Sequence, residues 1–351
     1  MVTLQSPLYG RVTLAGAASS PVQIPASATG IGSTAGIPAV STGLGRALTL
    51  LTGHLVVALV ALVVIGGTTR VMEAGLACPD WPLCYGVLLP GRQMNLQVFL
   101  EWFHRLDAFL VGLALLALSA LSLVFRSRLP RWLPWLSGAA LALVVAQGLL
   151  GALTVLHLLE ASTVTAHLAT ALLLVLLVSA LHQRLVVALI QPGNASEVSA
   201  IPAAATPLWW RLLLPLPVLL VLAQCVLGGA MASQWSAELC FAAGQACSWL
   251  LAHRLGAYPA ALSLLLLGLS SLALPAPARA LRGFALAGVG LVLLQVLLGI
   301  TTLRLQLAVP AVTVAHQFVA ALLVAVLGAL LGRSWPGSAP IALFNLEVDH
   351  G

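Results

Sequence analysis

Long apolar segments alternate with short polar ones along most of this 351-residue chain. Eight of the apolar segments contain about 20 residues or more, which is the length a helix needs to cross the hydrocarbon core of a membrane. Arginines, prolines and other polar residues separate them. The pattern predicts eight membrane-spanning helices, at residues 47–69, 97–125, 132–157, 161–188, 207–233, 249–273, 281–303 and 309–332.

Duplicated motifs divide these helices into two sets of four. HRLDA recurs as HRLGA, AHLATALL recurs as AHQFVAALL, and QGLLG recurs as QVLLG. His104 and His253, in the first motif, are 149 positions apart. His167 and His316, in the second, are separated by the same number. A shared offset indicates an internal duplication. We therefore expect an all-α membrane protein, built as two pseudo-symmetric four-helix bundles around an axis along the membrane normal.

The predicted helices define the expected domains. Residues 1–46 are rich in Ala, Ser, Gly, Pro and Thr and are expected to be a disordered cytoplasmic extension. A cleaved organellar targeting peptide is the alternative, because such peptides are basic and rich in Ser. The first bundle then covers 47–188, a cytoplasmic linker 189–206, the second bundle 207–332 and a C-terminal tail 333–351.

Composition and charge fit a membrane protein. Hydrophobic residues make up 61% of the chain and charged residues only 7%, so the net charge of +6 does not indicate nucleic-acid binding. The basic residues are all arginines, and most of them lie at the termini and in the segments after the second, fourth and sixth predicted helices. The positive-inside rule then places both termini in the cytoplasm of a bacterium. The loops that contain cysteine pairs would lie outside the inner membrane, on the oxidising side.

Four histidines repeat at similar depth near the outer ends of the predicted helices. Ionisable residues inside a membrane are costly and usually functional. Two facing imidazoles in a four-helix bundle suit axial ligation of a haem iron, so the pattern predicts one haem site in each half. Helix-packing histidines and a proton-coupled transporter are the alternatives. A copper or zinc site formed by the same histidines is a further alternative, but it would lack carboxylate or thiolate ligands at this depth.

An acidic residue accompanies only one of the predicted haem sites. Glu101 precedes His104 by three residues, so the two side chains share a helix face. The corresponding residue in the second half is Leu250. A carboxylate beside one haem predicts proton handling or stabilisation of developing positive charge. The alternatives are an acid at the membrane interface and an ion pair with Arg105 or Arg70.

Other polar residues without a counterpart in the second half are expected to be structural. Asp107 is expected to pair with an arginine. His54, His157 and His182 are expected to make local contacts, with His54 pairing with a neighbour. Cys225, inside a predicted helix, is expected to be a packed thiol.

Two repeated arginines each follow a predicted haem ligand. The guanidinium of Arg matches a carboxylate with two parallel N–H groups. Arg105 and Arg254 are therefore candidates for contacts with haem propionates. The alternative is that both hold the helix ends at the membrane interface.

Two pairs of cysteines lie in predicted outer loops. Prolines within the first loop restrict its conformation, which favours closure of a short disulfide. The spacing alone is weak evidence, so structural disulfides and redox coupling to the site both stay open. The candidate pairs are Cys78–Cys84 and Cys240–Cys247.

These motifs together resemble the haem A synthase family. The resemblance rests on GGTTRV…GLACPDWPLCYG, EWFHRLDA, AHLATALL, HRLGAY and AHQFVAALL, and covers about residues 47–332. It implies two four-helix bundles and oxidation of the C8 methyl of haem O to a formyl group, which gives haem A for cytochrome oxidase. Two successive hydroxylations, with oxygen from water, would give a gem-diol that loses water.

The resemblance also implies roles for particular residues. His104 and His167 would bind the substrate haem, His253 and His316 would bind haem b, and Glu101 would act beside the substrate. Among the cysteines, the Cys78–Cys84 pair would be the functional one. Haem O synthase and the assembly of cytochrome oxidase are the implied partners. An electron-transfer partner, which the sequence does not identify, is also implied, and a homo-oligomer is left open.

Two other functions are weighed against the enzyme. A quinol-linked diheme b-type electron carrier would bind two haems and change neither. A transporter would use the duplicated bundle for alternating access, without needing four histidines at one depth. Glu101 and the first cysteine loop favour the enzyme.

Overall fold

The computed structural model describes residues 40–189, 206–334 and 343–344. Within them, eight helical stretches are long and apolar enough to cross a membrane, which confirms the predicted all-α, multi-pass class. The long helices are α1 (Thr42–Val71), α2 (Leu96–Val124), α3 (Trp132–Leu156), α4 (Ala161–Leu189), α6 (Pro215–Ser233), α8 (Cys247–Ser271), α9 (Ala280–Arg304) and α10 (Pro310–Ser334). The short elements are β1 (Val40–Ser41), α5 (Leu208–Leu213), α7 (Ser236–Ala243), the 3₁₀ helix η2 (Ala276–Ala278) and β2 (Leu343–Phe344).

Prolines set several of these boundaries, because proline has no N–H to donate and is best tolerated in the first turn of a helix. Pro215 begins α6 and separates it from α5, so the fifth predicted span is an interrupted helix. Pro310 begins α10. Pro275 precedes η2 in the connection between α8 and α9.

The predicted boundaries differ from the structure in two places. Helix α1 begins at Thr42, so residues 42–46 are helical and do not belong to an extension. Helix α7 occupies part of the loop that precedes α8, where no helix was expected. The rest of the predicted extension, most of the linker and most of the tail lie outside the described residues.

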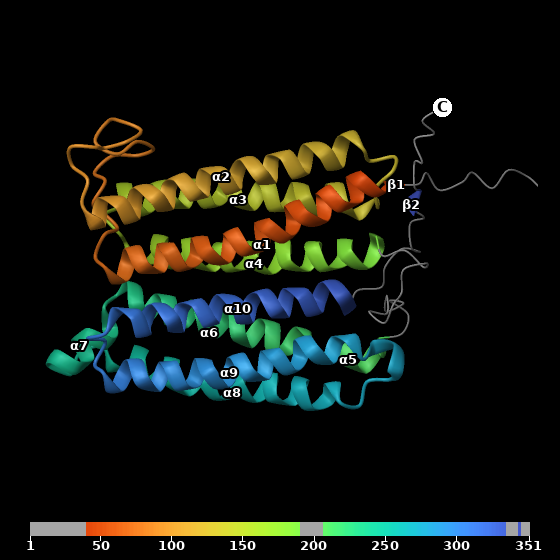
Figure 1. The fold of residues 1–351 in the computed structure, drawn as a ribbon. Helices are drawn as coiled ribbons and strands as arrows, with labels where there is room; N and C mark the ends of the chain where they lie inside the picture. The colour runs from red at the N-terminus through yellow and green to blue at the C-terminus, as the bar shows by residue number, and fades with distance from the viewer. Residues whose placement is uncertain (1–39, 190–205, 335–342, 345–351) are drawn as a thin grey trace, which may run out of the picture. The chain divides into compact units, whose positions relative to one another are not determined.

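The long helices pack as two sets of four (Figure 1). In the first set, α1 packs against α2 and α4, and α3 packs against the same two helices. In the second, α8 packs against α6 and α9, and α10 against α9 and α6. The cyclic order is the same in both sets; a rotation axis between them stays a prediction. Both loops with cysteine pairs lie at one end of the helices (Figure 1).

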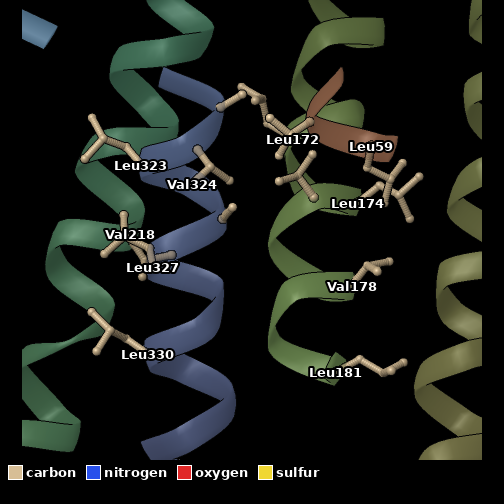
Figure 2. Close-up of a cluster of buried hydrophobic side chains, with 14 of the residues drawn as sticks. Leu59, Leu172, Leu174, Val178, Leu181, Val218, Leu323, Val324, Leu327 and Leu330 are labelled. Atoms are coloured by element: carbon tan, nitrogen blue, oxygen red, sulfur yellow. The ribbon is translucent and has the colours of Figure 1, made fainter. Parts of the chain in front are cut away.

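The two sets meet mainly along α4 and α10, which pack directly against each other. Figure 2 shows Leu172 and Val324 on the facing sides of these helices, whereas the other labelled leucines and valines point away from the contact, on the sides where Leu59 of α1 and Val218 of α6 lie. The helix backbones approach closely: a Cβ at Gly328 would lie 2.5 Å from the carbonyl oxygen of Leu176, and one at Gly332 would lie 2.1 Å from that of Ala180. Small residues four apart permit such approach in membranes.

The turns before α4 and α10 share an unusual backbone conformation. Leu158 and Leu159 have φ angles of 50° and 62°, and Gln306 and Leu307 have φ angles of 49° and 61°. These four residues lie in the left-handed region, which side chains with a Cβ rarely adopt. The same pair of strained residues thus precedes each helix that carries the second histidine of its half.

Candidate functional site

One continuous cavity is lined by residues from both sets of helices. Its volume is about 2380 Å³. A site for one drug-sized molecule usually measures about 300–1,000 Å³, so this cavity has room for more than one large ligand. The four repeated histidines line it: His104 on α2, His167 on α4, His253 on α8 and His316 on α10.

The histidines lie at corresponding heights in the bundle. Each is the seventh or ninth residue of its helix, and these four helices begin at the end that carries the cysteine loops (Figure 1). At 1.5 Å per residue, the rings are about 10 Å from the helix starts. His104 and His167 are close enough to interact electrostatically, as are His253 and His316.

A glycine on the preceding long helix faces each of the four imidazoles. A Cβ at any of these glycines would lie between 2.8 and 3.4 Å from the ring Cε1, so a larger residue would displace the ring. The missing side chain lets the ring lie against the neighbouring backbone. The four pairs are Gly66–His104, Gly151–His167, Gly228–His253 and Gly299–His316.

Hydrogen bonding to the rings differs between the two halves. In the described structure, Nδ1 of His104 and Nδ1 of His167 are buried and have no hydrogen-bond partner. Nδ1 of His253 lies 3.1 Å from the Gln224 amide, and Nδ1 of His316 lies 3.1 Å from the carbonyl oxygen of Gln295. Paired imidazoles against glycines, beside a large apolar cavity, fit a flat macrocycle held by axial ligands in each half.

Glu101 lies in the wall of the same cavity, one turn before His104, and is only 4% exposed. Its Oε2 accepts a hydrogen bond of 2.8 Å from the backbone N–H of Cys78. Its Oε1 forms an ion pair of 2.5 Å with Nη2 of Arg105. The carboxylate therefore connects the cavity to the first cysteine loop.

Arg105 also contacts this loop. Its Nη1 donates to the carbonyl oxygens of Asp80 and Leu83, and its Nη2 donates to that of Cys78 in addition to Glu101. Both terminal nitrogens are thus fully used, and no forked pair of N–H groups is left for a propionate. The structure instead contains the alternative that the sequence left open, an ion pair between Glu101 and Arg105.

Arg254, the counterpart of Arg105, lines the cavity. In the described residues it forms no ion pair within the chain. Its contact with a haem propionate stays a prediction.

Both predicted disulfides are present, Cys78–Cys84 and Cys240–Cys247. The first is almost fully buried beside Glu101, whereas the second links α7 to the start of α8. Asp80, inside the first loop, accepts hydrogen bonds from the N–H groups of Tyr85 (2.6 Å) and Gly86 (2.7 Å). These hydrogen bonds lower the pKa of the Asp80 carboxyl below its usual value, and the one from Gly86 has the larger effect.

The remaining predicted residues lie apart from the ligand pairs. His54 bonds to its own helix, His157 pairs with Glu160, and His182 bonds to buried Thr52 at 2.9 Å. Asp107 was expected to pair with an arginine, and this was wrong: the described residues include no such pair. The free thiol Cys225 is partly buried against the core and also borders the cavity.

Sequence reasoning missed two contributors to the site. Two of the four facing glycines, Gly151 and Gly299, occur in the repeated QGLLG and QVLLG motifs, but a glycine in a membrane helix has many possible reasons. Arg70 donates to the carbonyl oxygen of Ala232, and its guanidinium lies 4.6 Å from the ring centre of Trp235, so it joins the two halves at the cavity. Nothing in the sequence pairs these distant residues.

Comparison with known proteins identifies the family of the chain. The family model COX15-CtaA, described as cytochrome oxidase assembly protein, matches residues 49–328. The chain belongs to this family. The match includes all eight long helices at least in part, together with the four histidines and Glu101.

The individual relatives are described either as heme A synthase or as protoheme IX farnesyltransferase. The heme A synthase of Shewanella oneidensis is 28% identical over 312 residues, which cover 75% of this chain and 89% of that protein. That of Exiguobacterium sibiricum is 32% identical over 88 residues, 24% of this chain and 29% of that protein. A protoheme IX farnesyltransferase of Haloarcula marismortui is 37% identical over 78 residues, 22% of this chain and 16% of that protein.

Proposed function

We propose that this family member is a haem A synthase, which oxidises the C8 methyl of haem O to a formyl group. With water as the oxygen source, each methyl and one water give one formyl group, four protons and four electrons. The observation that carries the proposal is the pair of imidazoles in each half, together with a carboxylate in one half only. The nearly full-length similarity to a heme A synthase supports it.

The two halves are assigned different haems. His104 and His167 are the ligands proposed for haem O, because Glu101 lies beside them. His253 and His316 are the ligands proposed for a resident haem b. The Nδ1–H of His316 donates to the carbonyl oxygen of Gln295, and such a hydrogen bond fixes the orientation of a metal-ligating imidazole. A bound haem iron would supply the redox chemistry, His253 and His316 would hold the second haem, and an external acceptor would have to receive the four electrons.

Glu101 has the position for proton handling or charge stabilisation. Its carboxylate lies in the wall of an apolar cavity, where a fixed negative charge acts more strongly than in water. The ion pair with Arg105 and the Cys78 N–H orient it. We propose that it stabilises positive charge developing on the methyl carbon and accepts a proton from the attacking water.

The sides of the membrane and the partners follow as further proposals. The arginine distribution supports a bacterial inner membrane, with both termini in the cytoplasm and the cysteine loops outside. The site then opens near the outer surface. Haem O synthase would supply the substrate, and cytochrome oxidase would receive the product.

The test is haem extraction and chromatography from membranes of a host that makes haem O but no haem A. We expect haem A with the wild-type chain and a loss on the order of 10²–10⁴-fold with Glu101→Gln. Leu250→Gln, at the corresponding position of the second half, is the matched control and should retain activity. If the wild-type chain binds two haems and leaves haem O unchanged, it is an electron carrier and the proposal fails.

A further inference from the structure

The cavity walls of the two halves differ at one position on the third helix of each. Gln147 on α3 and Gln295 on α9 are equivalent residues, so the next positions, Gly148 and Val296, are equivalent too. Both line the cavity. Where the second half has a β-branched side chain, the first half has none.

Gly148 leaves free space at the wall of the cavity. The residue lines the cavity and is exposed, and a Cβ built on it would have no atom within 4 Å. Phe109, on the adjacent helix α2, also lines the cavity and is 62% exposed. The cavity wall of the first half therefore has free space beside Gly148, next to α2.

The corresponding face of the second half carries larger side chains. Val296 is 39% exposed, and Ile300, one turn further along α9, is 46% exposed and lines the cavity. The residue of α3 at the position of Ile300 is Ala152. At these two positions α9 therefore carries more side-chain volume than α3 does.

We propose that Gly148 determines which haem the first half accepts, by leaving a passage for the isoprenoid chain of haem O. This inference rests on the proposed function. Haem O differs from haem b by a long apolar farnesyl-derived chain, which needs apolar space beside the macrocycle. Gly148 lies three residues, about 4.5 Å along the helix, from Gly151, which faces His167. The passage therefore begins next to the ligated macrocycle.

Bulk at this position selects between the two haems by steric conflict. In the first half, a side chain at 148 would occupy the path of the chain, since overpacking is resolved only by shifting backbone or rotamers. In the second half, Val296 and Ile300 narrow the same path, which suits a haem without the chain. Substrate and resident haem would thus be sorted by side-chain volume.

The test measures bound haems in the purified chain, expressed with haem O present, by extraction and chromatography. Gly148→Ala and Gly148→Val are compared with the wild-type chain, and Val296→Gly is the matched variant of the second half. We expect Gly148→Val to lower bound haem O plus haem A at least fivefold, with Gly148→Ala intermediate and haem b unchanged. Val296→Gly should raise bound haem O relative to haem b.

The Gly148→Ala variant controls for misfolding, because alanine is a better helix former than glycine and should not destabilise α3. A visible spectrum with haem b intact shows that the second half is folded. If the Gly148 variants keep wild-type amounts of haem O, or lose haem b and haem O in equal proportion, the inference is wrong. If the wild-type chain itself binds neither haem O nor haem A, the proposed function fails as well.

Discussion

Arg105 shows how a single side chain can hold a loop at the edge of a membrane. Its two terminal nitrogens donate to three carbonyl oxygens of the Cys78–Cys84 loop and to Glu101. A lysine keeps the charge but provides one nitrogen on a flexible stem, so it cannot replace the planar fork.

We therefore expect Arg105→Lys to loosen the loop and to speed reduction of its disulfide. Loss of one hydrogen bond to a charged group costs about 1.5–3 kcal/mol, which corresponds to a rate increase of roughly tenfold or more. The measurement is the rate of Cys78–Cys84 reduction by a small thiol, followed by alkylation and mass spectrometry. Arg254→Lys is the control and should leave this rate unchanged; equal rates in all three proteins would contradict the proposed role of Arg105.

The carboxylate of Asp80 is expected to make the stability of the Cys78–Cys84 loop depend on pH. Backbone N–H groups of Gly86 and Tyr85 lower its pKa from the ordinary 3.8, so the charged form is favoured in the folded loop. The stabilisation is complete above the ordinary pKa and is lost as the pH falls through the lowered one.

Amide hydrogen exchange at Tyr85 and Gly86 tests this dependence in the wild-type chain and in Asp80→Ala. The wild-type loop should be better protected, by a constant factor at neutral and mildly acidic pH. The difference should shrink once the pH drops below the ordinary aspartate pKa. A difference that persists unchanged through strongly acidic pH would show that the carboxylate charge is not responsible.

At the scale of the helices, the closest contact is between α4 and α10. Gly328 and Gly332 allow it, since side chains there would overlap carbonyl oxygens of α4. Ser179 adds a hydrogen bond of 2.6 Å to the carbonyl oxygen of Ala325 across the contact. The first and second bundles are therefore fitted to each other along one pair of helices.

Gly332→Val is expected to separate α4 from α10 and to destabilise the protein by about 1–3 kcal/mol or more. Thermal unfolding in detergent measures the change. Gly290→Val is the matched control, because a Cβ at Gly290 on α9 meets no atom within 4 Å. The same loss of stability in both variants would mean that the effect arises from helix propensity and not from the contact.

The sequence predicted the helices and the histidines better than the contacts between them. Hydropathy defines where a helix can cross a membrane, and duplication distinguishes His104, His167, His253 and His316 from histidines with local roles. The partners of Arg105 could not be predicted, because they are backbone carbonyls of an irregular loop. Gly151 and Gly299 were visible in the repeated motifs, but only packing shows why glycines are needed opposite the rings.

At the scale of the whole molecule, the distribution of arginines predicts which end faces outward. The loops with the disulfides and Arg92 lie at one end, and Arg279 lies in the connection at the other (Figure 1). Both arginines are exposed. This makes them suitable positions for a labelling experiment.

Single cysteines at these positions report orientation in intact cells. We expect Arg92→Cys to react with a membrane-impermeant maleimide in intact cells. Arg279→Cys should react at least tenfold more slowly than Arg92→Cys until the cells are opened. Cys225→Ala in the background removes the free thiol. The opposite pattern would place the proposed haem sites near the cytoplasmic surface and would contradict the proposed orientation.

The hydrogen bond from the Cys78 N–H to Glu101 has a consequence for spectroscopy. The donor belongs to one of the two residues joined by the first disulfide, so opening that disulfide changes the strength of the bond that the carboxylate accepts. The vibrational frequency of a carboxylate depends on such bonds. An infrared difference spectrum, with Glu101→Gln to assign the band, would therefore record the oxidation state of two sulfur atoms through an oxygen atom in the wall of the cavity.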